Sequence, residues 1–222
     1  MCGAGDYFLK EAAKNSSGEA VREKRALILF VRKPELGKVK TRLAAGIGEE
    51  AALAAYLKML AHTRGLSLDV HAERHLFYFP EVPKQDDWPE DLFHKHVQAE
   101  GDLGEKMRSA FETVFALGHD KALIIGSDCL DLRPSHLESA YRGLAMQDFV
   151  LGPASDGGYY LLGMHKLEPR LFEQKAWSTD TVAKDTLADI AALGKTVHLL
   201  PMLNDIDTEA DYRAALLRNR MD

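Results

Sequence analysis

Short apolar runs that alternate with segments of helical spacing constrain the fold of this chain more than any other feature of its sequence. Each run is bounded by polar residues or proline, which is typical of strands with both faces buried. The runs are residues 26–31, 76–79, 122–126, 149–152 and 197–200. Apolar residues three or four positions apart predict helices over 49–64, 104–117, from Pro134 onward, 179–193 and 208–217. Alternating strands and helices predict right-handed crossovers and a mainly parallel sheet in a three-layer α/β domain.

Length and charge indicate one domain that does not bind nucleic acid. The chain has 222 residues and a net charge of −6, from 28 Lys and Arg against 34 Asp and Glu. One domain suits this length, and we expect residues 1–24 to be a polar tail or surface helix and residues 25–222 to be the domain. A nucleic-acid surface needs clustered cations, so the acidic balance disfavours one.

The sequence also predicts a cytoplasmic location. No apolar run approaches the roughly 20 residues that span a bilayer, so we expect no membrane span. The N-terminal residues lack the apolar core and cleavage site of a secretory signal. Two cysteines, Cys2 and Cys129, neither build a disulfide framework nor have the spacing of zinc ligands. A reducing compartment is therefore expected.

The segment after the first predicted strand is unusually basic for an acidic protein. It carries five cations within eleven residues: Arg32, Lys33, Lys38, Lys40 and Arg42. Gly37 lets a backbone approach a ligand closely, and Lys38, Lys40 and Arg42 can neutralise a di- or triphosphate. The spacing is not that of a P-loop. A solvated basic loop is an equally good interpretation of composition alone.

Carboxylates follow two other predicted strands. Asp128 and Asp131 come after the run at 122–126, where Mg²⁺ can take carboxylate oxygens together with substrate phosphates. Asp205 and Asp207 come after the last strand and can complete a metal site with Asp128. The alternative is helix capping, by Asp128 or Asp131 at the helix that follows them, or by Asp207 or Thr208 at the last helix.

A glycine pair marks another loop with possible chemistry. Asp156, Gly157 and Gly158 supply a carboxylate and positive-φ positions before an alternating strand begins. The glycines leave room for a flat substrate, with Tyr159 and Tyr160 able to stack or hydrogen-bond. A plain hairpin is the competing interpretation.

Other chemistries have less sequence support. The nine histidines show no H-E-x-x-H spacing, so we expect most of them at surface or core positions. No G-x-S-x-G motif is present for serine hydrolysis. Cys129 stands beside Asp128, whose charge disfavours a thiolate nucleophile.

Five motifs in order resemble a known bacterial family. They are KPELGKVKTRL, GDLGEKM at 101–107, GSDCLD, GPASDGGYYLLG and DIDT. Together they resemble uncharacterised glycosyltransferase-A-like transferases related to 2-phospholactate guanylyltransferase and molybdenum-cofactor guanylyltransferase, from about Ala26 to Leu217. The resemblance implies a three-layer nucleotide-diphospho-sugar transferase fold, with a mixed, mainly parallel sheet and nucleotide at the carboxyl ends of its strands. The chain departs from the pattern at Leu130, where proline is usual, and at Lys106, where arginine is frequent.

The resemblance also implies site residues. Asp128 matches the metal-binding aspartate of the related nucleotidyltransferases, and Asp207, with Asp205 nearby, matches the region of their second metal ligand. With the loops above, nucleotide or phosphate contacts are expected from Arg32, Gly37, Lys38, Lys40, Arg42, Gly101, Asp102, Gly104, Gly157 and Gly158. Catalytic roles are expected for Lys38, Arg42, Asp128 and Asp156.

Metal-dependent nucleotidyl transfer is the leading functional hypothesis. A phosphorylated small molecule would attack the α-phosphate of a nucleoside triphosphate, with Mg²⁺ or Mn²⁺ at Asp128 and Asp207 and the basic loop at the departing pyrophosphate. Glycosyl transfer from a nucleotide-diphospho-sugar is the alternative, with Asp156 or another carboxylate activating the acceptor hydroxyl. A nucleotide-binding protein without catalysis is the third hypothesis.

Overall fold

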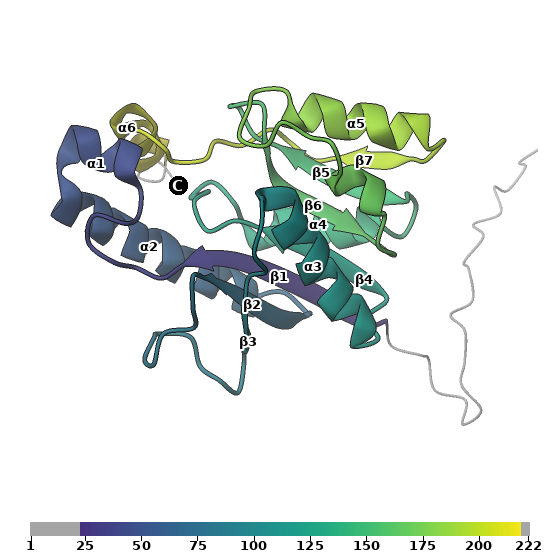
Figure 1. Ribbon diagram of the computed structural model, residues 1–222, viewed down its shortest axis with the longest axis horizontal. Coiled ribbons are helices and arrows are strands. Elements are labelled where there is room, and N and C mark those ends of the chain that lie inside the picture. Colours follow the sequence, from purple (N-terminus) through teal and green to yellow (C-terminus); the bar gives the residue numbers. More distant parts are fainter. Residues whose placement is uncertain (1–22, 219–222) are drawn as a thin grey trace, which may run out of the picture.

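A single mixed sheet organises the protein. The structure, a computed structural model, describes residues 23–218, and in this part of the chain seven strands pair in the order β3-β2-β1-β4-β6-β5-β7 (Figure 1). Only β6 of these seven runs antiparallel to its neighbours, β4 and β5. The strands are β1 (Arg25–Arg32), β2 (Glu73–Phe79), β3 (His94–Val97), β4 (Lys121–Ile125), β5 (Phe149–Pro153), β6 (Tyr159–Met164) and β7 (Val197–Leu199).

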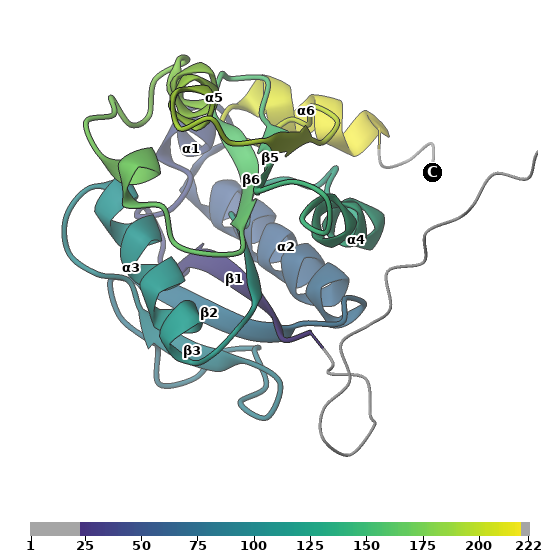
Figure 2. The same cartoon turned by 90° about the vertical axis from the view of Figure 1, so that its right-hand side faces the viewer.

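Helices cover both faces of this sheet. They are α1 (Thr41–Ile47), α2 (Glu49–Leu68), α3 (Leu103–Ala116), α4 (Pro134–Gly143), α5 (Val182–Ala192) and α6 (Glu209–Arg218), with a 3₁₀ turn η1 (Pro169–Phe172). The alternation of side chains along β1 divides the core in two. Leu27 and Leu29 pack toward α1, α2, α4 and α6, whereas Ala26 and Ile28 pack toward α3, η1 and α5. Figure 2 shows α3 on one side of the sheet and α2 and α4 on the other.

The structure confirms the predicted fold and most predicted elements. All five apolar runs are strands, and each predicted helix is present with ends shifted by a few residues. Three elements were missed. Strand β3 has the sequence HKHV at the sheet edge, so it lacks an apolar signal. Helix α1 begins at the end of the predicted basic loop and extends to Ile47, and the short η1 was not predicted.

Two further expectations concern the ends and the membrane. The predicted tail, apart from residues 23 and 24, lies outside the described residues. None of the helices in residues 23–218 has the length and apolar character of a membrane span.

Core packing under α3 gives a stability prediction. Phe111 is fully buried against the sheet, whereas Leu117 at the end of the same helix is 57% exposed. We expect Phe111→Ala to lower the free energy of unfolding by about 3–5 kcal/mol, because it leaves a cavity. Leu117→Ala, the matched control, should change it by less than about 0.5 kcal/mol. Urea denaturation measures both, and equal effects would contradict this account of the core.

Candidate functional site

A cavity of about 720 Å³ opens at the carboxyl edge of the parallel strands. Its walls come from the carboxyl ends of β1, β2 and β4 and from the segments that follow β1, β3 and β4, as expected for a sheet of this type. The start of β6 also contributes, through Tyr159 and Tyr160. Because β6 is antiparallel, its first residues lie at the edge where its neighbours end.

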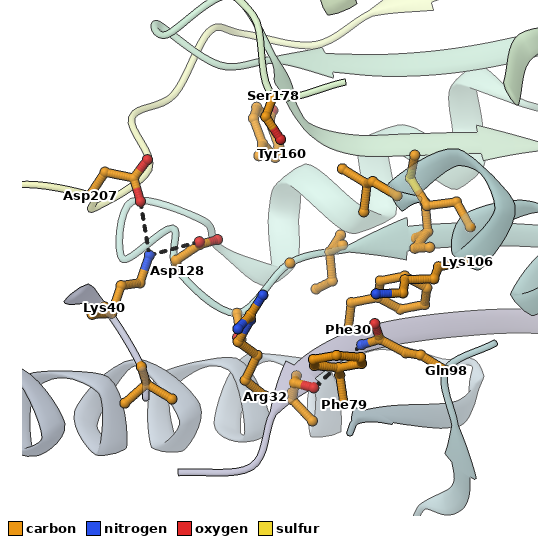
Figure 3. A pocket seen from close by; sticks show the side chains of 18 of the residues that line it. Phe30, Arg32, Lys40, Phe79, Gln98, Lys106, Asp128, Tyr160, Ser178 and Asp207 are labelled. Carbon is orange, nitrogen blue, oxygen red and sulfur yellow. Dashed lines mark hydrogen bonds and ion pairs between the residues drawn. The ribbon is translucent and has the colours of Figure 1, made fainter. Parts of the chain in front are cut away.

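An ion cluster at one end of the cavity joins three loops. The Lys40 ammonium donates to Asp128 Oδ2 at 2.9 Å and to Asp207 Oδ1 at 3.3 Å (Figure 3). Arg42 Nη2 lies 2.9 Å from Asp207 Oδ2. The side chain of Lys40 is only 9% exposed, whereas that of Arg42 is 75% exposed. The sequence-predicted residues Lys40, Arg42, Asp128 and Asp207 thus meet at one place.

Backbone geometry fixes this cluster. Lys40 has φ 47° and ψ 47°, a left-handed conformation, directly before α1. The amide of Ile206 donates to the carbonyl of Asp128 at 3.0 Å, and Ile206 itself is fully buried. This bond brings the segment after β7 against the segment after β4, so that Asp205 and Asp207 face Asp128.

The electrostatics of the cluster are dominated by its carboxylates. Burial by itself lowers the pKa of Lys40, but the charges of Asp128 and Asp207 outweigh burial and the pKa is raised. Burial, followed by the charges of Asp128 and Asp156, raises the pKa of Asp205 to about 8. Asp205 Oδ1 is buried and has no hydrogen-bond partner among the described residues. Near neutral pH the site therefore holds a protonated carboxyl group, Asp205, beside two carboxylates that pair with Lys40 and Arg42.

A second group of cations surrounds an aromatic ring farther into the cavity. The Phe79 ring has Lys106 Nζ 4.0 Å and Arg32 Cζ 5.3 Å from its centroid (Figure 3). Within residues 23–218, neither Lys106 nor Arg32 forms an ion pair with a carboxylate. Both cations are therefore able to bind an anionic ligand without breaking a salt bridge.

The remaining cations of the basic segment differ from one another. Lys38 lines the cavity, yet its side chain is 73% exposed and lies 2.9 Å from Glu35 Oε2. Lys33 pairs with Glu35 and Glu81 instead. The structure therefore divides this segment between cavity cations and ordinary surface ion pairs.

Gly101, Asp102 and Gly104 form the beginning of α3. Asp102 Oδ1 accepts from the Glu105 amide at 2.9 Å while Glu105 Oε2 accepts from the Asp102 amide at 2.9 Å, a capping box. A Cβ on Gly104 would lie 2.6 Å from the Trp177 ring. Gly101 and Asp102 also line the cavity, so a ligand contact and a structural role coincide at these two residues.

The Asp-Gly-Gly segment has the geometry of a tight turn. Asp156 Oδ1 accepts from the Gly158 amide at 2.9 Å. Gly157 has φ +88°, and a Cβ there would lie 2.0 Å from the carbonyl oxygen of Asp180, so only glycine fits. Neither Asp156 nor the two glycines line the cavity. These observations favour the hairpin interpretation, with Tyr159 and Tyr160 as the part of the motif that faces the cavity.

The capping alternatives are also resolved. Asp131 is paired with Arg218 of α6, at 2.8 Å, and Arg133 precedes α4. Asp211 Oδ2 accepts from the Thr208 amide at 2.8 Å and from its hydroxyl at 2.7 Å. Thr208, and not Asp207, therefore begins α6, which leaves the Asp207 carboxylate to the ion cluster.

Sequence reasoning missed several cavity residues. Phe79 ends a predicted strand, and Gln98 follows the unpredicted β3, where its amide nitrogen donates to the Phe77 carbonyl at 3.1 Å. Tyr56 of α2 also lines the cavity, and its hydroxyl accepts a hydrogen bond from the Arg32 amide at 2.8 Å. The signal for Phe79 was its place at a strand end, whereas Tyr56 offered none beyond helical spacing.

Comparison with known proteins supports the resemblance. Residues 63–179, more than half of the chain, match the family described as "Uncharacterized protein conserved in bacteria (DUF2064)". A crystal structure of a candidate nucleotide-diphospho-sugar transferase from Desulfovibrio desulfuricans G20 is 30% identical, with a TM-score of 0.76 over 90% of this chain and 96% of that protein. No curated protein matches the sequence.

More distant solved structures share the fold. CMP:2-keto-3-deoxy-manno-octonic acid synthetase, solved with CTP, is 10% identical with a TM-score of 0.55, over 90% of this chain and all of that protein. Rv0371c from Mycobacterium tuberculosis H37Rv, solved with manganese, is 13% identical with a TM-score of 0.54, over 88% of this chain and 99% of that protein. The expected nucleotide-diphospho-sugar transferase fold is thereby confirmed.

The raised pKa of Asp205 predicts a pH-dependent stability. Between its ordinary pKa near 3.8 and about 8, the folded protein holds a proton at Asp205 that the unfolded chain has released. Folding stability is therefore lost as pH rises through this window. In chelator-treated protein, Asp205→Asn should raise the melting temperature relative to wild type more at about pH 8.5 than at about pH 5. Asp69→Asn, at an exposed carboxylate, is the control; an Asp205→Asn effect that is the same at both pH values would contradict the shift.

Proposed function

The chain belongs to the bacterial family DUF2064, and on that premise we propose that it catalyses metal-dependent nucleotidyl transfer from a nucleoside triphosphate to a phosphorylated small molecule. The observation that carries this proposal is a single cavity with an acidic cluster at one end and cations along its length. A nucleoside triphosphate with its divalent metal carries charges complementary to these, since the metal suits the acidic cluster and the phosphates suit the cations. The complexes of fold relatives with CTP and with manganese support the same choice of ligands.

The acidic cluster suits a divalent ion. Asp205 Oδ1 is a buried oxygen with no hydrogen-bond partner in the described part of the chain, and Lys40 supplies one positive charge among Asp128, Asp205 and Asp207. Carboxylate oxygens are the ligands that Mg²⁺ and Mn²⁺ prefer. These three aspartates would hold the ion, and the bound ion would supply positive charge next to the reacting phosphate.

Side chains of the protein would bind and orient the reactants. In the proposed step, an oxygen of the acceptor phosphate forms a bond to the α-phosphorus, and the bond from that phosphorus to the bridging oxygen of pyrophosphate breaks. The leaving pyrophosphate takes the electron pair. The charge of pyrophosphate would be stabilised by Lys38, Lys40 and Arg42. The α-phosphate of the nucleotide, or the acceptor phosphate, would be held by Arg32 and Lys106.

Glycosyl transfer from a nucleotide-diphospho-sugar is the second candidate, since the same residues would bind that donor. One observation weighs against it. Asp156, the carboxylate expected to activate an acceptor hydroxyl, is hydrogen-bonded within its own turn and does not line the cavity. The cations around the cavity also suit the larger charge of a triphosphate.

Ligand stabilisation and product analysis test the proposal together. We expect one nucleoside triphosphate to raise the melting temperature only with Mg²⁺ or Mn²⁺, because a ligand that binds the folded state stabilises it by mass action. With a phosphorylated acceptor, pyrophosphate should then be released. Release of a nucleoside diphosphate from a nucleotide-sugar would establish glycosyl transfer instead. Binding without turnover across an acceptor panel would favour a non-catalytic protein, and no stabilisation at all would refute a nucleotide site.

The role of Asp128 is tested by a matched pair of variants in one loop. Asp128→Asn should lower the metal-dependent turnover by about 100-fold or more, because it removes a charged ligand of the metal ion that would stabilise the reacting phosphate. Asp131→Asn, three residues later, weakens only the contact with Arg218 and should leave turnover within about twofold of wild type. Circular dichroism establishes that both variants are folded. Equal turnover of Asp128→Asn and wild type would exclude Asp128 as a metal ligand.

A further inference from the structure

A cluster of histidines lies at the amino ends of the parallel strands, whereas the cavity lies at their carboxyl ends. Glu73 begins β2, His75 follows it on the same face, and His119 lies in the turn between α3 and β4. His94 of β3 pairs in register with His75, and His96 with Phe77, so both point to this same face. The amino ends of β2, β3 and β4 therefore gather four imidazoles and one carboxylate.

The distances in this cluster match a metal coordination sphere. His75 Nε2 lies 3.1 Å from His119 Nε2, which lies 3.6 Å from Glu73 Oε2. These three potential ligand atoms all lie within 4.8 Å of one another, and in the part of the chain that the structure describes only Glu73, His75 and His119 form such a group. Ligands about 2.0–2.1 Å from a tetrahedral ion are themselves separated by about 3.3–3.4 Å. The separations of His119 Nε2 from its two neighbours, 3.1 and 3.6 Å, lie on either side of that value.

The surroundings prepare these side chains for a transition metal. His75 is 1% exposed and the side chain of His119 is 2% exposed, whereas Glu73 reaches solvent and gives an entry path. His75 Nδ1 lies 3.2 Å from His96 Nε2, so a proton on Nδ1 would be shared with His96 and leave the Nε2 lone pair free. Burial, followed by the charges of neighbouring imidazoles, lowers the pKa of His75 to about 3, which keeps the ring neutral.

We propose that Glu73, His75 and His119 bind one transition-metal ion, with Zn²⁺ as the ion that two imidazoles and a carboxylate favour. A fourth ligand would come from His94, whose Nε2 lies 3.9 Å from Glu73 Oε2, or from a water molecule. The bound ion would link the amino end of β2 to the turn before β4, and this link would add to the hydrogen bonds between the strands of the sheet. The site is separate from the acidic cluster of the cavity, whose all-oxygen ligands suit Mg²⁺ or Mn²⁺.

Cobalt titration of the untagged, full-length, chelator-treated protein tests the site. Co²⁺ replaces Zn²⁺ in such sites and gives intense visible absorption when it is four-coordinate. We expect one equivalent to bind wild type with that spectrum, and Zn²⁺ to displace it. His119→Gln and Glu73→Gln should each weaken binding about tenfold or more, by loss of a ligand. Because Glu73 is 58% exposed, its variant should fold even if the buried histidine variant does not.

Two controls separate this site from others. His165→Gln removes an exposed histidine that contacts the Gln147 carbonyl, and it should bind Co²⁺ as wild type does. The double variant Asp128→Asn with Asp207→Asn removes the acidic cluster and should also retain the spectrum, whatever the fate of nucleotidyl transfer. Absence of the four-coordinate spectrum in wild type, or equal binding by Glu73→Gln and wild type, would refute the proposal.

Discussion

One buried ammonium group, Nζ of Lys40, holds together three loops that are distant in sequence. It lies between Asp128, after β4, and Asp207, before α6, while its own backbone starts α1. Without a cation at this point, the carboxylates would repel one another in a partly buried site. The walls of the cavity at this end depend on that balance. The same arrangement gives the site its chemical character, because the oxygens of three acidic side chains lie beside one lysine and one arginine.

The antiparallel strand β6 gives the cavity its second distinctive wall. In a fully parallel sheet, the edge where β4 ends would be met only by loops that leave strands. Here β6 enters at that edge and brings Tyr159 and Tyr160 beside the carboxyl ends of its neighbours. The turn before it is fixed by Gly157, which packs against the backbone of Asp180. The glycine pair thus contributes to the cavity indirectly, because it forms the turn that places Tyr159 and Tyr160 of β6 in the cavity wall.

Much of the architecture was predictable because buried strands and helices show a local pattern of apolar residues in the sequence. The apolar runs and helical spacings identified the strands and helices that pack on both faces of the sheet. Elements without such an apolar pattern were missed, as the polar edge strand β3 and the short α1 illustrate. In the site, residue types at strand ends singled out Lys40, Arg42, Asp128 and Asp207, which meet in the structure. The ring of Phe79 and its two cations were not predicted as a unit, because cation–aromatic contacts have no sequence spacing.

The sequence by itself determined the fold class, the edge of the sheet where charged loops gather, and the family resemblance, since each depends on local patterns or on motifs in order. Tertiary structure decided which charges meet. It placed Lys40 between two aspartates 88 and 167 residues away, paired Asp131 with Arg218, and brought His75 to His119 across 44 residues. These contacts depend on strand order and register, and nothing in the spacing of the residues along the chain encodes a distance in space. For that reason the spacing of the histidines did not single out His75 and His119 as partners, although three ligand atoms of this cluster lie within reach of one ion in the fold.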